Sequence, residues 1–197
     1  SNAEVLTTCE QSRFLNHASL NRLLLNLILE RKGAILVVIL YSCLIVYGAT
    51  VGIQASDSSE FVLASMQGVR VHPPGYPFTI VWFKSFQVLS NNPMWNAAVA
   101  NGILSAFALG LVADAIRLRV GSNTIGVWTV LVLGLQPLWL RYSSIPEAFS
   151  SLALVYAGVL WVSSHPVVNR WQAVVLGVFC MVGIASHHMF ILAAPII

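Results

Sequence analysis

The chain has 197 residues, of which 57% are hydrophobic and only 9% are charged. Soluble domains carry about 25% charged residues, so this composition excludes an ordinary water-soluble domain and indicates a polytopic membrane protein. The formal net charge of +3 comes from scattered Lys and Arg rather than from a basic run, so nucleic acid is not an expected partner. The first three residues, Ser-Asn-Ala, are typical of the remnant of a cleaved tag and are left out of the fold prediction.

Residues 4–32 predict an amphipathic helix. Its apolar residues recur at spacings of three and four, among them Leu24, Leu27 and Ile28. Such a helix fits the membrane surface, and packing on the rest of the protein explains the pattern equally well. Four basic residues precede the first apolar span, which predicts a cytoplasmic N-terminus: Arg13, Arg22, Arg31 and Lys32.

Residues 33–197 predict an all-α, polytopic integral membrane bundle of about six transmembrane helices. The first span, 33–53, carries no charge and is as long as the ~20 residues that cross the hydrocarbon. The second is short and carries Lys84, which would have to reach an interface. The later apolar segments are 77–90, 95–116, 124–140, 146–162 and 171–197.

Strict alternation of these spans creates a conflict in the topology. It places the loop 54–77 on the outer face, and it places Arg117 and Arg119 outside as well. It also places Arg141 and Glu147 inside. Either one segment does not cross, or Glu147 lies on the face opposite to Asp57, and both alternatives stay open.

The loop 54–77 contains the first candidate site residues, Asp57 and Glu60. One interpretation is a capping box, in which both carboxylates accept hydrogen bonds from the first turn of a helix. The other uses their spacing, since residues three apart share a helix face and could serve one cavity. There they could act as a general base or hold a divalent cation. Ionisable groups beside a membrane span favour a functional site.

The same loop ends in His-Pro-Pro-Gly-Tyr-Pro at 72–77. The prolines fix their own φ and restrict the residues before them, so the segment predicts a rigid elbow. One interpretation is a structural elbow with an interfacial Tyr76. The other adds His72 as a phosphate partner or metal ligand. We expect Asp57, Glu60 and His72 to converge on one cavity.

These motifs resemble the GT-C superfamily, membrane glycosyltransferases that use polyprenyl-phosphate-linked sugars. Within it they resemble the domain-of-unknown-function family related to transmembrane protein 260, an O-mannosyltransferase. That family's Asp-x-x-Glu followed by His-Pro-Pro-Gly-Tyr-Pro stands here at 57–60 and 72–77. Further likenesses lie at 101–106, at 139–147, and at 183–188 with Pro195. The likeness covers the N-terminal part of such an enzyme.

The resemblance implies transfer of a hexose such as mannose from a polyprenyl-phosphate donor to a hydroxyl of a protein or glycan acceptor, with inversion. Asp57 would be the catalytic base, and Glu60 would support it or share a divalent metal cation. Four residues would bind the donor phosphate or the substrate: His72, Tyr76, Glu147 and His188. The resemblance also implies a bacterial inner membrane or its equivalent, with membrane lipid around the bundle and the site loop on the outer face.

Other interpretations stay open. Glu147 after Pro146 also fits the first turn of a helix, where the helix dipole favours a carboxylate. His187 and His188 point about 100° apart if helical, so at most one faces a given site, and a packing histidine is common. The chain could instead be a non-enzymatic membrane component, such as a transporter half or an assembly subunit. It could also be a truncated, inactive GT-C-like module that binds a lipid or a partner.

Overall fold

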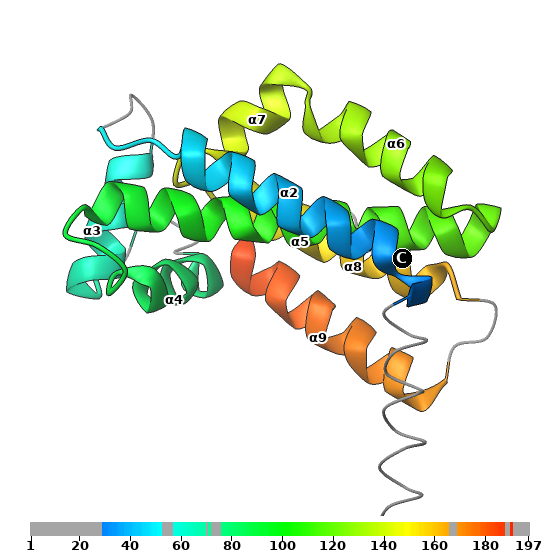
Figure 1. Cartoon of the computed structure of the whole chain (residues 1–197). Coiled ribbons are helices and arrows are strands. Elements are labelled where there is room, and N and C mark those ends of the chain that lie inside the picture. The colour runs from blue at the N-terminus through cyan, green and yellow to red at the C-terminus, as the bar shows by residue number, and fades with distance from the viewer. Residues whose placement is uncertain are drawn as a thin grey trace, which may run out of the picture.

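The computed structural model describes residues 29–52, 57–69, 71, 76–165, 169–187 and 190. Within these residues the chain is helical and contains no β-strand, which confirms the predicted all-α class. Figure 1 shows the other helices arranged around α5. The described helices are α2 (Lys32–Gly48), α3 (Ser58–Gln67), α4 (Pro77–Phe86), α5 (Pro93–Val120), α6 (Asn123–Gly134), α7 (Pro137–Ser143), α8 (Phe149–Ser163) and α9 (Arg170–Ser186).

α5 is central because its neighbours approach it closely. The side chain of Asn92 caps its start by accepting a hydrogen bond from the Trp95 amide, at 3.0 Å. Most of its inward residues are Ala, Gly or Ser, which let α2, α6 and α8 pack against its backbone. At Gly102 even a Cβ atom would overlap the side chain of Ile45 in α2.

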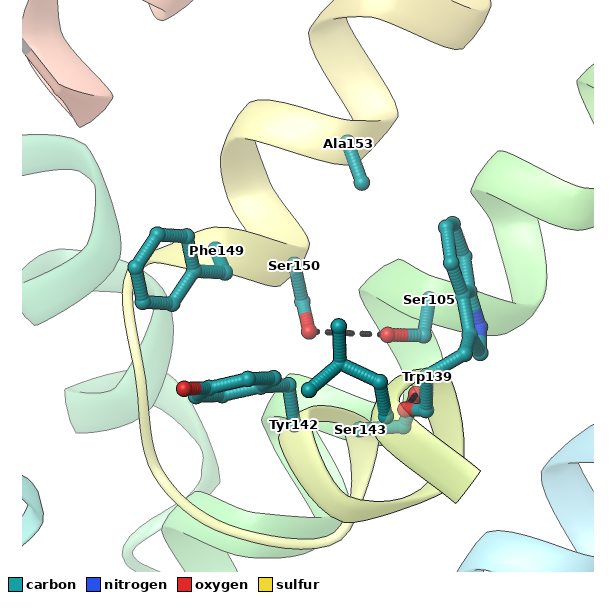
Figure 2. Close-up of a pocket in the computed structure, with 8 residues that line it drawn as sticks. Ser105, Trp139, Tyr142, Ser143, Phe149, Ser150 and Ala153 are labelled. Carbon is teal, nitrogen blue, oxygen red and sulfur yellow. Dashed lines mark hydrogen bonds between the residues drawn. The ribbon is translucent and has the colours of Figure 1, made fainter. Parts of the chain in front are cut away.

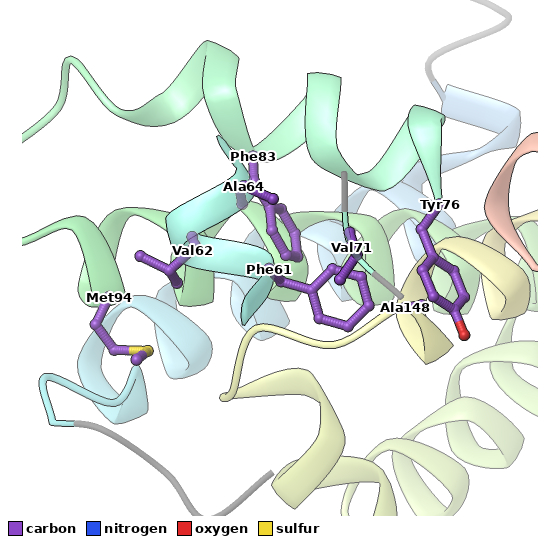
Figure 3. Close-up of a cluster of buried hydrophobic side chains, with 10 residues drawn as sticks. Phe61, Val62, Ala64, Val71, Tyr76, Phe83, Met94 and Ala148 are labelled. Atoms are coloured by element: carbon purple, nitrogen blue, oxygen red, sulfur yellow. The ribbon is translucent and has the colours of Figure 1, made fainter. Parts of the chain in front are cut away.

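α3 and α4 form a short pair at the N-terminal end of α5 (Figure 1). They share a core with α5 in which Phe61, Phe83 and Met94 are buried (Figure 3). Because α3 is helical, the loop after the first apolar segment is partly helical. Each helix has 10 residues, or about 15 Å, whereas the hydrocarbon is about 30 Å thick. The predicted span at 77–90 is therefore not a crossing.

The predicted span at 124–140 is broken into α6 and α7, which bend by 77° at the break. Pro137 begins α7 and has no N–H to continue the hydrogen bonding of α6. The hydroxyl of Tyr41 in α2 donates to the Gly134 carbonyl and to Ser143 Oγ, at 3.2 Å each. These two hydrogen bonds link the break between α6 and α7 to α2.

Within the described residues, α5 is the one helix that is long and apolar enough by itself to cross a membrane. The bent pair α6 and α7 is a second candidate if it counts as one span, and α2, α8 and α9 are apolar but shorter. About six crossings are therefore not confirmed. The amphipathic helix predicted at 4–32 lies outside the described residues except for its last four positions.

Candidate carboxylate site at one end of the bundle

Asp57 and Glu60 lie at the start of α3. Asp57 is the N-cap residue, but it has helical backbone angles and its side chain makes no capping hydrogen bond. The capping-box interpretation is therefore wrong, since that box needs an extended N-cap residue whose side chain accepts from the first turn. Glu60 lies in the first turn, where the helix dipole favours a negative charge. Asp57 is exposed and Glu60 is half-buried.

Tyr76 is the residue on which the charges of three carboxylates act. Its side chain is only 6% exposed, and its ring meets the edge of Phe61 at a centroid distance of 5.1 Å (Figure 3). Burial raises the pKa of the Tyr76 hydroxyl, and the negative charges of Asp57, Glu147 and Glu60 raise it further. The phenol therefore stays protonated at neutral pH, and it can donate a hydrogen bond within a negative field.

The backbone of Tyr76 is strained. With φ 45° and ψ 50° it is the one non-glycine residue of the described ranges that has a positive φ. Such a conformation costs about 1–3 kcal/mol and persists only where the surroundings impose it. The following residue is Pro77, which normally favours an extended residue before it. Strain of this kind is enriched at functional sites, and here it accompanies the gathering of three carboxylates.

Glu147 lies in the loop between α7 and α8, and it is 7% exposed. α8 begins only at Phe149, so Glu147 precedes the helix rather than occupying its first turn. Asn101 of α5 holds this loop, because its Nδ2 donates to the carbonyls of Tyr142 and Ile145 at 2.7 Å each. The end of α2 adds a backbone hydrogen bond from the Thr50 amide to the Ser144 carbonyl, at 3.1 Å.

This arrangement bears on the topological conflict in the predicted spans. Glu147 and Asp57 both act on Tyr76, so they lie at the same end of the bundle. Among the predicted spans, 77–90 contains the shortest helix, because α4 has only 10 residues and is too short to cross by itself. Arg117 and Arg119, in the last turn of α5, then fall at the other end.

His187 joins the site although it was not among the predicted site residues. It follows α9, and its ring centroid lies 5.3 Å from that of Tyr76 and 6.2 Å from that of Phe149. The pair of histidines at the end of this apolar segment was the sequence signal for a site histidine. The family resemblance favoured His188 for that role. His72 and His188 lie outside the described residues.

A cavity of about 370 Å³ adjoins this cluster (Figure 2). Phe149 connects the two, since its ring lines the cavity and stacks with His187. The wall is mostly apolar, and Ser105 Oγ donates to Ser150 Oγ across it at 2.8 Å. Trp139 Nε1 is buried without a hydrogen-bond partner in the described structure. The lining residues are Ser105, Leu138, Trp139, Tyr142, Ser143, Phe149, Ser150 and Ala153.

A divalent cation was one expectation for Asp57 and Glu60. In the part of the chain that the structure describes, no three His, Cys, Asp or Glu side chains are grouped so that they could hold a metal ion. A cation held by Asp57 and Glu60 alone stays a prediction.

The fold and the site define an all-helical bundle in which carboxylates from two distant parts of the chain meet at one end, beside an apolar cavity. Residues 57–134 match the family model described as the protein O-mannosyl-transferase TMEM260 N-terminal domain. The chain is thus similar to the TMEM260 family over these residues, which confirms the family resemblance seen in the sequence.

A curated relative is the protein O-mannosyl-transferase tmem260 of Dictyostelium discoideum. It is 23% identical over 187 residues, which cover 84% of this chain and 23% of the relative. The chain thus spans about a quarter of the length of that protein. No solved structure matches the chain.

Proposed function

We propose that this chain is the membrane-embedded N-terminal part of a GT-C-like glycosyltransferase. The enzyme transfers a hexose such as mannose from a polyprenyl-phosphate donor to an acceptor hydroxyl of a protein or glycan, with inversion. The observation that carries the proposal is that the charges of Asp57, Glu147 and Glu60 all act on Tyr76, whose side chain is buried at the start of α4. The relationship to O-mannosyl-transferases supports the choice of sugar and reaction.

Each residue of the site has a role in this scheme. Asp57 is the most exposed of the three carboxylates and takes the proton from the acceptor hydroxyl. The hydroxyl oxygen attacks the anomeric carbon from the face opposite to the leaving group, and polyprenyl phosphate departs, so the configuration inverts. Glu60 supports Asp57 through the shared helix face. Glu147 accepts a hydrogen bond from a sugar hydroxyl, and Tyr76 donates one.

The adjoining cavity suits a lipid-linked donor. A sugar on a polyprenyl phosphate arrives from the bilayer, so its enzyme needs an apolar passage beside the reacting groups. The cavity of about 370 Å³ is walled mainly by Leu138, Trp139 and Phe149, and it reaches the carboxylate site through Phe149. His72 and His188, by the family resemblance, are proposed to bind the donor phosphate.

The membrane setting is supported by an inverted distribution of polarity. Large apolar side chains are exposed along several helices, for example Ile39 at 55%, Val132 at 64% and Met181 at 71%. Polar side chains such as Asn101 and Ser105 are buried against α5 instead. Soluble monomers rarely expose apolar surface on this scale, whereas membrane bundles face it toward lipid.

The proposed topology has five crossings rather than six. They are α2, α5, the broken pair α6 and α7, α8 and α9, while α3 and α4 lie on the outer face. This order places Arg31, Lys32, Arg117, Arg119 and Arg170 at the cytoplasmic end, as the positive-inside rule favours. It places Asp57 and Glu147 together on the outer face.

The test is transfer of labelled mannose from polyprenyl-phosphate mannose by the full-length protein. Asp57→Asn keeps the size of the side chain and removes the base, so transfer should fall by about 10²- to 10⁴-fold with the fold intact. Glu30→Gln, at an exposed residue of the other end, is the matched control and should keep full activity. Full transfer by Asp57→Asn would overturn the catalytic assignment, and a wild type without transfer would favour the non-enzymatic alternatives.

A further inference from the structure

A second cavity, of about 460 Å³, extends toward the C-terminal end of α5, away from the carboxylate site. Its walls come from α2, α5 and α8, and we name it the basic-end groove. Arg31 and Asp114 lie at its polar end, and Ile39 and Phe107 line its apolar length. Its volume is in the range of about 300–1,000 Å³ that is typical of sites for small ligands.

The polar end of the groove has an excess of positive charge. Asp114 is 4% exposed, and Arg117 Nε donates to its Oδ1 at 2.7 Å while Trp161 Nε1 donates to its Oδ2 at 2.8 Å. Arg31 Nε lies 3.5 Å from the same Oδ2. Two guanidinium groups thus share one carboxylate. Because Arg117 and Trp161 already satisfy that carboxylate, Arg31 is the member that a second anion can recruit.

Arg31 is also the accessible member of this group. Its side chain is 40% exposed, against 18% for that of Arg117. Its guanidinium lies over the ring of Trp161, with Cζ 5.6 Å from the ring centroid, so its plane is held at the mouth of the groove. A guanidinium in this position offers fixed N–H donors to a phosphate.

The rest of the groove is apolar and open. Ile35 is 39% exposed, Ile39 is 55% exposed and Phe107 is 49% exposed, although all three line the cavity. Such residues favour a hydrocarbon occupant over water. The groove therefore has a charged end that matches a phospholipid headgroup and an apolar length that matches an acyl chain.

We propose that the basic-end groove binds one anionic phospholipid, with its phosphate on Arg31 and an acyl chain along α2 and α5. The positive charge of Arg31 favours an anionic headgroup. The apolar walls favour a lipid over free phosphate. The proposal rests on the membrane setting of the proposed function and not on its transfer activity. Basic pockets between membrane helices on the cytoplasmic side are suited to such headgroups.

The experiment is native mass spectrometry of the full chain in detergent with phosphatidylglycerol or phosphatidylcholine that carry the same acyl chains. We expect phosphatidylglycerol to bind about five-fold more tightly, as one cationic side chain near a phosphate provides. Arg31→Gln should remove this preference while Arg117 and Trp161 keep Asp114 satisfied. Arg141→Gln, at an exposed arginine of α7, should leave the preference unchanged.

A second pair of variants tests the apolar part. Ile39→Trp fills the trough and should lower the binding of both lipids, whereas Leu36→Trp, on an exposed position of α2 outside the groove, should not. Equal binding of the two lipids, an unchanged preference in Arg31→Gln, or displacement of phosphatidylglycerol by inorganic phosphate would each overturn the proposal. Mannose transfer measured on Arg31→Gln keeps the two proposals separate, since we expect it to stay at the wild-type level.

Discussion

The two ends of the bundle use carboxylates in opposite ways. At the basic end one buried carboxylate, Asp114, receives hydrogen bonds from Arg117 and Trp161 and an ion pair from Arg31. At the other end the charges of three carboxylates act on the phenol of Tyr76. The first arrangement gathers cations and an indole on one anion. The second gathers anions around one neutral donor.

The difference shows which carboxylates hold the fold and which are available for chemistry. Asp114 links α5 to α2 and α8, so its hydrogen bonds contribute to packing. Asp57 is exposed and caps no helix through its side chain, although it stands at a helix start. The same residue type therefore serves stability at one end and, in our proposal, proton transfer at the other.

The largest effect expected from this comparison is on stability. Asp114→Ala removes the shared partner of Arg31 and Arg117, and it should lower the free energy of unfolding by about 3 kcal/mol. Glu30→Ala, at an exposed position, is the control and should change it little. Thermal unfolding of the purified chain measures both. An Asp114→Ala variant as stable as the wild type would show that this end does not hold the bundle together.

A smaller effect, on transfer activity and not on stability, is expected at Glu147. Glu147→Gln keeps the size of the side chain and removes its charge beside Tyr76, and it should lower mannose transfer by about 100-fold without changing the unfolding temperature. Glu30→Gln again serves as the control. If Glu147→Gln lowers stability as much as Asp114→Ala does, the carboxylates of both ends stabilise the fold and the proposed difference between the ends is wrong.

The smallest effect concerns the Tyr76 hydroxyl and the pH. Its pKa is raised in the folded state, so its contribution to stability is fully present below the unfolded pKa of about 10 and is lost as the pH rises through the higher folded pKa. Tyr76→Phe cannot ionise and should lose less stability between about pH 8 and about pH 11. Equal losses in both proteins would show that the pKa of Tyr76 is raised neither by burial nor by the three carboxylates.

Apolar composition predicted the helices well but not their geometry. All six predicted spans contain helices in the described residues, yet only α5, and α6 with α7 if the bent pair is one span, are long and apolar enough to cross. α4 has only 10 residues. Lys84 and the short length of the apolar segment were the signals for this short helix. The 77° break between α6 and α7 follows from Pro137, which a count of apolar residues overlooks.

The sequence predicted the candidate site only in part, because local spacing does not determine long-range contacts. The spacing of Asp57 and Glu60 is the same for a capping box and for a shared cavity, and only the backbone angles of Asp57 distinguish the two. The placement of Glu147 and Asp57 around Tyr76 depends on the packing of the short α4 and on Asn101 holding the loop after α7. These are long-range contacts, so no local pattern in the sequence carries them.

The most direct test of the account is whether the two halves of the site face the same side of the membrane. Single cysteines would replace exposed residues Ser59, Arg141 and Val120 in a protein whose Cys9, Cys43 and Cys180 have been changed to serine. An impermeant thiol reagent applied to intact cells should label positions 59 and 141, and it should reach position 120 only after the membrane is opened. Labelling of 59 and 141 from opposite sides would contradict the shared carboxylate site.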